Sequence, residues 1–171
     1  WHPNENYSKS YAAKSVLGGG VTLTQIHELD YLMWIFGDIQ KIYSITGKFS
    51  HLKVSADDLS ASLLQLKNEA IVELHLDYFS RPYYKQLKIR GTKGILYWNS
   101  NENTVKLFNL KTQKWKNLTV KNNYKLSSKK LNQMYVDEIN YFFTCIIKNK
   151  KPMNNISEAK NTLKNALNIL K

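Results

Sequence analysis

The sequence has 171 residues, of which 43% are apolar and 22% charged, as is typical of one globular domain. It contains no run of 18 apolar residues, which excludes a membrane-spanning helix, and residues 1–6 lack the apolar core of a signal peptide. The single cysteine, Cys145, excludes an intrachain disulfide and a multi-cysteine zinc site. We therefore expect no metal, no membrane contact and a reducing compartment, the cytoplasm. Because the chain starts without methionine, in polar sequence, we expect it to be part of a longer protein.

The net charge is +12, from 25 basic and 13 acidic residues. Arg81 and Arg90 are the only arginines, although arginine is the residue best suited to bidentate contacts with bases and phosphates. The lysines are spread along the chain, so we interpret the charge as a solvated surface and expect no nucleic-acid partner. A basic surface for phosphorylated or nucleotide-bearing ligands stays open as an alternative.

The first predicted element is a turn at Gly18–Gly20, because adjacent glycines permit backbone conformations that other residues rarely adopt. Apolar residues at the helical period then predict a helix over residues 24–36. Thr24 is its expected N-cap, and Gly37 follows its last apolar residue, where a C-terminal glycine is common.

The middle of the chain is rich in β-forming residues separated by short turns, which indicate antiparallel neighbours. We expect seven strands, at residues 39–49, 59–66, 70–79, 84–90, 94–98, 104–110 and 114–120. Two helices close the chain. The first spans residues 131–148, and Ser157 is the expected cap of the second.

This order of elements predicts an α+β fold, a mostly antiparallel sheet of about seven strands with helices on one face. The other face of the sheet needs a cover, and a second copy of the chain would provide one. We therefore expect a homo-oligomer, a dimer or tetramer. The sequence contains neither the G-x-G-x-x-G nor the G-x-x-x-x-G-K-[ST] phosphate-binding motif.

The residues best suited to chemistry lie in the helix predicted at 24–36. His27 is in its first turn, where the positive end of the helix dipole disfavours the imidazolium ion. A neutral imidazole can accept a proton or hydrogen-bond a hydroxyl group. Asp30, Tyr31 and Trp34 lie on the same side of this helix. From the residues alone a structural role for His27 stays open, because a lone histidine on a helix is more often structural.

One stretch carries a family resemblance. Residues 18–39, GGGVTLTQIHELDYLMWIFGDI, resemble the first helix of the C-terminal domain in the glucose–fructose oxidoreductase, inositol dehydrogenase and MocA (Gfo/Idh/MocA) family. Residues 56–64, 73–82 and 89–98 resemble further segments of that domain in the same order. The resemblance extends over essentially the whole chain, and the glycine–histidine–aspartate segment is its most specific part.

The resemblance implies an NAD(P)-dependent oxidoreductase of two domains, in which a Rossmann domain binds NAD or NADP and supplies a catalytic lysine. We expect residues 1–171 to be the C-terminal substrate-binding and oligomerisation domain, inactive alone. The Rossmann domain, absent from this chain, would be its partner and hold the cofactor-binding residues. The expected substrate is a sugar, nucleotide-sugar or cyclitol that reacts at a hydroxyl or carbonyl. The alternative is a non-catalytic sugar-binding or assembly domain of the same fold.

The resemblance also assigns roles to residues. The family's histidine corresponds to His27, which would be the catalytic general acid/base. The family's paired aspartate corresponds to Thr24, and a threonine cannot replace a carboxylate as base or as a charged orienter of the ring. This departure favours the non-catalytic alternative, or it leaves Glu28 or Asp30 as the partner of His27.

Other substrate contacts are expected from Lys14, Thr24, Asp30, Asp77, Tyr78 and Arg81. Asp77 and Tyr78 close a strand and Arg81 lies just beyond, so these three could rim a cleft. Two structural alternatives are an Asp77–Arg81 ion pair and Asp30 holding a neighbouring loop. We expect Trp34 to pack in the core or at a domain interface, and Cys145 to be an inert buried thiol.

Overall fold

The fold is taken from a computed structural model that describes residues 5–102, 104–118 and 133–171. The chain divides into two compact units. The first comprises Trp1–Ser80 and Met153–Lys171, and the second comprises Arg81–Pro152. Two predicted segment ends, residues 119–120 of the last strand and 131–132 of the following helix, lie outside the described residues.

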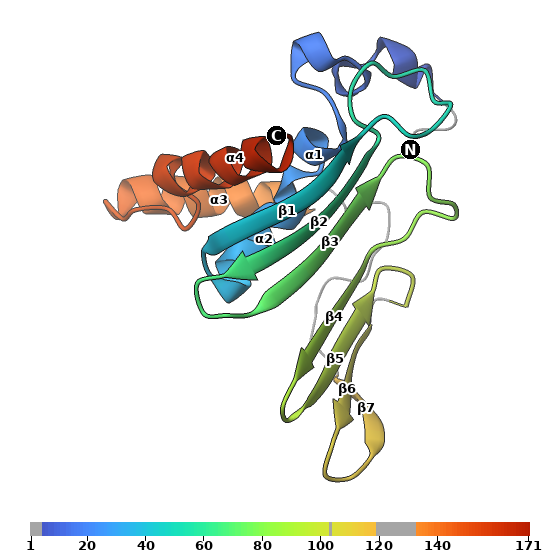
Figure 1. The fold of residues 1–171 in the computed structure, drawn as a ribbon. Coiled ribbons are helices and arrows are strands. Elements are labelled where there is room, and N and C mark those ends of the chain that lie inside the picture. Colours follow the sequence, from blue (N-terminus) through green and yellow to red (C-terminus); the bar gives the residue numbers. More distant parts are fainter. Residues whose placement is uncertain (1–4, 103, 119–132) are drawn as a thin grey trace. The chain divides into compact units, whose positions relative to one another are not determined.

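The first unit combines a three-stranded antiparallel sheet with short turns and helices (Figure 1). Its 3₁₀ turns are η1 (Tyr7–Lys9), η2 (Tyr11–Ala13) and η3 (Ser15–Leu17). Its helices are α1 (Val21–Thr24), α2 (Ile26–Phe36) and α4 (Ile156–Ile169). The strands pair in the order β1 (Ile39–Gly47), β2 (Leu59–Leu66) and β3 (Ile71–Asp77).

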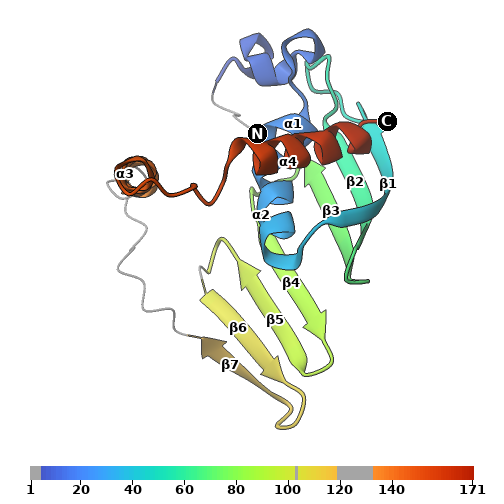
Figure 2. The same ribbon diagram turned by 90° about the vertical axis from the view of Figure 1, so that its left-hand side faces the viewer.

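The helices cover one face of this sheet, as Figure 2 shows for α2 and α4. Alternate residues of β2 point to the covered face and are buried, because side chains alternate between the two faces of a strand. The core packs Leu64 of β2 against Leu29 of α2 and against Ala166 and Ile169 of α4. The position of α2, and thus of His27, depends on this packing.

The opposite face of the three-stranded sheet exposes large apolar side chains. The set is Tyr43 and Ile45 of β1, Leu63 of β2 and Ile71 of β3. Tyr43 lies opposite Leu63 in the strand register, so these residues form a contiguous patch. We call this patch the outer face.

The second unit contains a four-stranded antiparallel sheet of consecutive hairpins and one helix. The elements are β4 (Gln86–Gly91), β5 (Gly94–Asn99), β6 (Thr104–Asn109), β7 (Lys114–Leu118) and α3 (Gln133–Ile147). Phe108 and Trp115 lie opposite each other on β6 and β7, with ring centroids 5.3 Å apart. Such cross-strand aromatic pairs stabilise a sheet.

The predicted α+β class is confirmed, and the seven strands occur within one to two residues of the expected ends wherever the chain is described. The prediction of a single sheet of about seven strands was wrong, because the strands form two separate sheets, one of three strands and one of four. The reason lies after β3, where Asp77 Oδ1 accepts hydrogen bonds from the backbone N–H groups of Phe79 and Ser80. This turn withdraws both N–H groups from strand pairing and ends β3.

Two helix predictions also need correction. The helix expected over 24–36 is divided at Gln25, so Thr24 ends α1 and is not an N-cap. The last helix is capped by Asn155 in a capping box with Glu158, two residues before the predicted cap Ser157. No helix among the described residues is long and apolar enough to span a membrane.

Candidate active site

The glycine turn sets the start of the helices that carry His27. Gly20 has φ +114° and its N–H donates to the Ala12 carbonyl at 2.9 Å. The carboxylate of Asp57 then binds α1: its Oδ2 accepts from the Thr22 N–H at 2.9 Å and the Thr22 hydroxyl at 2.7 Å. A side-chain acceptor at a helix N-terminus satisfies N–H groups that have no partner in the helix. Asp57 therefore anchors the segment leading to His27.

The next residue, Asp58, holds the loop between β1 and β2. Its side chain is fully buried, at 0% exposure. It accepts hydrogen bonds from Phe49 N at 2.7 Å, Ser50 N at 3.1 Å and Ser50 Oγ at 2.5 Å. A buried carboxylate is tolerated only when it is bonded in this way. Together the two adjacent aspartates tie this loop to the glycine turn.

His27 contacts a carboxylate, although not the one that the family pattern provides. Its Nε2 lies 3.2 Å from Oε1 of Glu28. The His27 side chain is 59% exposed, whereas that of Glu28 is 9% exposed. Burial, and then a hydrogen bond from the Tyr31 hydroxyl to Glu28, raise the pKa of Tyr31 far above its ordinary value. The result is a cluster in which one buried carboxylate binds an exposed imidazole and a protonated phenol.

Thr24 and Tyr78, two predicted substrate contacts, are brought together. The Tyr78 hydroxyl donates to Thr24 Oγ1 at 2.8 Å, and Tyr78 is only 1% exposed. Burial raises the pKa of Tyr78 to about 12, with Asp57 and Tyr11 adding to the shift and the Thr24 hydrogen bond opposing it. At the position where the family pattern places a carboxylate, the Thr24 hydroxyl thus binds the buried phenol of Tyr78, the residue just after β3.

Asp30 faces α4. Its Oδ1 accepts from the Thr162 hydroxyl at 2.7 Å, and its Oδ2 accepts from Asn154 at 3.5 Å. These contacts are the ones expected of a carboxylate that holds a neighbouring segment. Trp34, expected in the core or at a domain interface, is 68% exposed within the described residues.

Lys14 is exposed and lies between η2 and η3, where its carbonyl accepts from Gly19 N at 3.0 Å. Asp77 ends β3 with its carboxylate engaged locally. Its Oδ2 contacts His75 Nε2 at 2.9 Å and the Ser80 hydroxyl at 2.6 Å. Burial raises the pKa of Asp77, but the hydrogen bonds from Ser80, His75 and the Phe79 N–H outweigh it, so the pKa is lowered. Arg81 begins the second unit and is exposed.

An open polar pocket of about 570 Å³ lies on the first unit, away from the His27 cluster. It is lined by residues at the start of β1, the end of β2 and one face of α4, among them Asp38, Lys67, Asn161 and Lys164. None of the predicted site residues lines it. In the part of the chain that the structure describes, no group of three His, Cys, Asp or Glu residues could hold a metal ion.

Sequence reasoning missed Tyr31 as a partner of Glu28 and the anchoring roles of Asp57 and Asp58. The spacing of Tyr31 and Glu28, three residues apart on a helix, indicates a possible contact between them. Nothing in the sequence shows which backbone groups the two aspartates bind, because those groups lie up to 35 residues away along the chain.

A sequence profile described as the GFO/IDH/MocA C-terminal domain matches residues 1–97. No curated protein sequence gives a significant match. Many solved structures share the fold.

Three similar structures illustrate the match. UDP-N-acetylglucosamine 3-dehydrogenase from Acidithiobacillus ferrooxidans is 14% identical with a TM-score of 0.73, over 97% of this chain and 48% of that one. WlbA dehydrogenase from Bordetella pertussis, in complex with NADH and UDP-GlcNAcA, is 19% identical with a TM-score of 0.68. The match covers 96% of this chain and 47% of that one. Aldose-aldose oxidoreductase from Caulobacter crescentus is 12% identical with a TM-score of 0.76, and the match covers 95% of this chain and 48% of that one. The chain therefore spans about half the length of these proteins.

Proposed function

The chain belongs to the GFO/IDH/MocA C-terminal domain family, and from that premise we propose that it is the substrate-binding half of an NAD(P)-dependent sugar oxidoreductase. The observation that carries this proposal is the contact between His27 and the buried Glu28 carboxylate, 3.2 Å apart. It gives the imidazole a carboxylate partner in a chain where Thr24 replaces the family's aspartate.

In the proposed reaction His27 is the general acid/base. It takes the proton of a substrate hydroxyl when the alcohol is oxidised, and returns it when the carbonyl is reduced. The nicotinamide supplies the hydride chemistry when bound. We assign no residue of this chain to hold it, because the sequence has no dinucleotide-binding motif; we expect a Rossmann domain to bind NAD or NADP.

The proposed substrate is a sugar, nucleotide-sugar or cyclitol. The known structures of this fold support that class, because they include a UDP-N-acetylglucosamine dehydrogenase and an aldose-aldose oxidoreductase. Further proposed contacts are Lys14, Asp77 and Arg81, which carry charge at or near the ends of elements. We propose that Thr24, Tyr78 and Asp30 support the site without touching the substrate, since each side chain is hydrogen-bonded to another residue of the first unit.

The test is His27→Ala in the full-length protein with its Rossmann domain. UDP-sugars, free aldoses and cyclitols are screened with NAD and NADP by the absorbance of the reduced nicotinamide, and the variant is assayed on the best substrate. We expect kcat to fall at least about tenfold, or roughly 1.4 kcal/mol in the barrier, because proton transfer then lacks its side-chain catalyst.

The matched control is His51→Ala, which removes an exposed imidazole from the loop between β1 and β2. We expect it to leave kcat unchanged. A smaller loss in His27→Ala, or equal losses in both variants, would remove the assigned role of His27. Absence of turnover with every substrate, together with sugar binding, would favour the non-catalytic alternative.

We also propose that the outer face pairs with a second copy of the chain. Its four large apolar side chains are exposed, and burying them would gain the hydrophobic free energy of association. The same face carries Lys41 on edge strand β1 and Glu73 on edge strand β3. Opposite charges on opposite edges suit self-association about a two-fold axis, since each lysine can meet the partner copy's acidic edge.

The oligomer is tested by light scattering of the chain after size-exclusion chromatography. We expect a dimer or larger for the wild type, and a monomer for the double variant Tyr43→Lys, Ile45→Lys, because two ammonium groups cannot be buried against a second apolar face. Val16→Lys, which changes an exposed apolar residue outside the sheet, should keep the wild-type mass. A monomeric wild type at high concentration would contradict the proposal.

A further inference from the structure

We propose that Glu28 is the positioning residue of His27: its carboxylate accepts the Nε2 proton and thereby makes Nδ1 the ring atom that exchanges the substrate proton. The role of Nδ1 in catalysis rests on the function proposed above, whereas the position of the ring proton does not. The inference starts from the arrangement of three carboxylate or hydroxyl groups around α2.

Three residues could replace the missing aspartate as the partner of His27, and two of them are bound elsewhere. Thr24 Oγ1 accepts from the buried Tyr78 hydroxyl at 2.8 Å. Asp30 binds Thr162 of α4 at 2.7 Å. Glu28 is the one of the three that contacts the ring, at 3.2 Å from Nε2.

The Glu28 carboxylate is well held. Its side chain is 9% exposed, so it samples few conformations compared with a surface glutamate. It lies in the first turn of α2, where the helix dipole favours a negative charge. The Tyr31 hydroxyl donates to it from one turn further along, and the raised pKa of Tyr31 keeps that phenol protonated and able to donate. An acceptor held in one position can favour one tautomer of an exposed imidazole ring.

The consequence follows from imidazole chemistry. A neutral imidazole has one N–H and one basic nitrogen, and the hydrogen bond made by one nitrogen sets the state of the other. A carboxylate can only accept, so a ring nitrogen bonded to it must carry the proton. With the proton on Nε2, the lone pair that takes the hydroxyl proton lies on Nδ1. When Nδ1 is protonated, the positive ring is stabilised by the adjacent carboxylate.

The experiment measures the ring nitrogens of His27 by long-range proton–nitrogen correlation on the ¹⁵N-labelled chain, in buffer alkaline enough to keep the imidazoles neutral. In the wild type we expect Nε2 to resonate as a protonated nitrogen and Nδ1 as an unprotonated one. In Glu28→Ala the two tautomers should interconvert, so the two nitrogen signals should move towards each other. Glu28→Gln, which keeps the shape and loses the charge, should move them in the same direction and by less.

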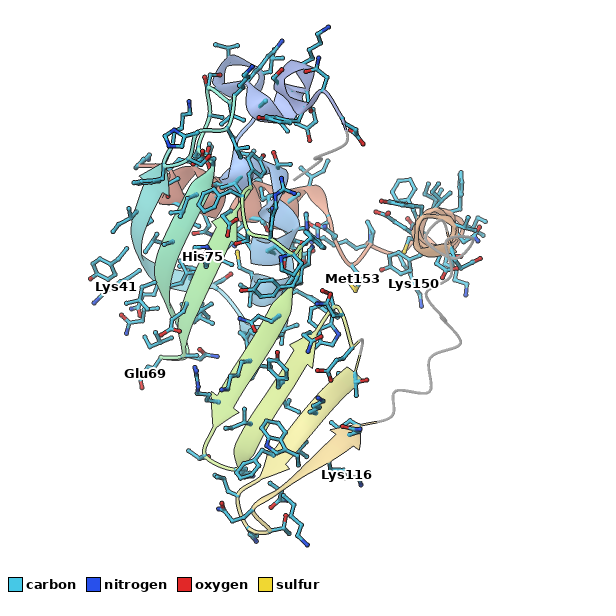
Figure 3. All side chains as sticks on the ribbon, turned by 90° about the vertical axis from the view of Figure 1, so that its right-hand side faces the viewer. Lys41, Glu69, His75, Lys116, Lys150 and Met153 are labelled. Carbon is cyan, nitrogen blue, oxygen red and sulfur yellow. The ribbon has the colours of Figure 1, made fainter. Side chains whose placement is uncertain are left out.

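Two controls make the result specific. His75 (Figure 3) also has its Nε2 beside a carboxylate, with a hydrogen bond of 2.9 Å to Asp77 Oδ2, and its ring signals should not change when Glu28 is replaced. Glu138→Ala removes an exposed carboxylate of α3 and should leave the His27 signals unchanged. If Glu28→Ala does not fold, the shift of the His27 nitrogen signals in Glu28→Gln tests the inference instead. A wild-type proton on Nδ1, or identical His27 signals in wild type and the folded Glu28 variants, would overturn the inference.

The inference and the proposed function fail separately. Altered ring signals in Glu28→Ala combined with full turnover in His27→Ala would leave the contact standing and remove the catalytic role. Loss of turnover in His27→Ala with unaltered ring signals would retain the function and remove Glu28 as the positioning residue. If the inference and the proposed function are both correct, Glu28→Ala in the two-domain enzyme should lower kcat more than it raises KM.

Discussion

Replacing Asp58 by Asn should lower the free energy of unfolding by about 3 kcal/mol or more, since charge-assisted hydrogen bonds are lost and buried donors are left without an acceptor. The Asp58 side chain is fully buried and accepts two backbone N–H groups and one hydroxyl. An asparagine keeps one acceptor oxygen and turns an NH₂ group towards the remaining donors. The loss is measured by urea unfolding of the chain, followed by circular dichroism.

The control is Asp38→Asn. Asp38 is half exposed, and its Oδ2 pairs with Lys67 at 2.7 Å on the surface. Such a pair contributes on the order of 1 kcal/mol or less, because solvent screens it. Equal losses in the two variants would show that the buried bonds of Asp58 are not what holds the loop between β1 and β2.

Gly20→Ala should be similarly damaging, lowering the free energy of unfolding by about 2–4 kcal/mol through backbone strain and the lost anchoring of α1. Gly20 has φ +114° and ψ 155°, a region that is essentially restricted to glycine and strained for other residues. A Cβ atom there would also overlap the Asp57 carboxylate, which would have to move and release the N-terminus of α1. Loss of a helix cap alone costs about 1 kcal/mol. Thermal and urea unfolding would measure the change.

Gly18→Ala separates these two causes. Gly18 also has a positive φ, +72°, but nothing lies within 4 Å of the Cβ position, so only backbone strain is added. We expect it to cost about 1–2 kcal/mol. If Gly18→Ala is as damaging as Gly20→Ala, the anchoring of α1 by Asp57 does not contribute to stability.

Local features of the fold could be predicted from the sequence, whereas the grouping of its strands could not. Alternation in segments such as residues 59–66 reports which side chains face a core, and the strand β2 occupies the same residues. Hairpins are local too. Whether β3 continues into a larger sheet depends on how the Asp77 carboxylate binds Phe79 and Ser80, which periodicity does not contain.

Sequence reasoning pointed to His27 through its residue type, its helix position and the family resemblance, and its catalytic role stays a prediction. The division of the helix at Gln25 was missed, because the periodic spacing of apolar residues continues across Gln25, whereas the helical backbone is interrupted there. The Thr24–Tyr78 bond joins residues 54 positions apart, and no local pattern could pair them. Asp30 fits the structural alternative better than a substrate contact, since its carboxylate faces α4.

The placement of α4 in the first unit has a consequence for biosynthesis. The strands β1–β3 are made before residues 81–152, yet the face they bury is completed by Ala166 and Ile169 of α4. Ser44 of β1 binds the carbonyl of Ile169, 125 positions later. Closing such a distant contact is slow, and apolar surface exposed in the meantime promotes aggregation. On the ribosome, the nascent sheet must therefore wait until the second unit has been synthesised before α4 can cover it.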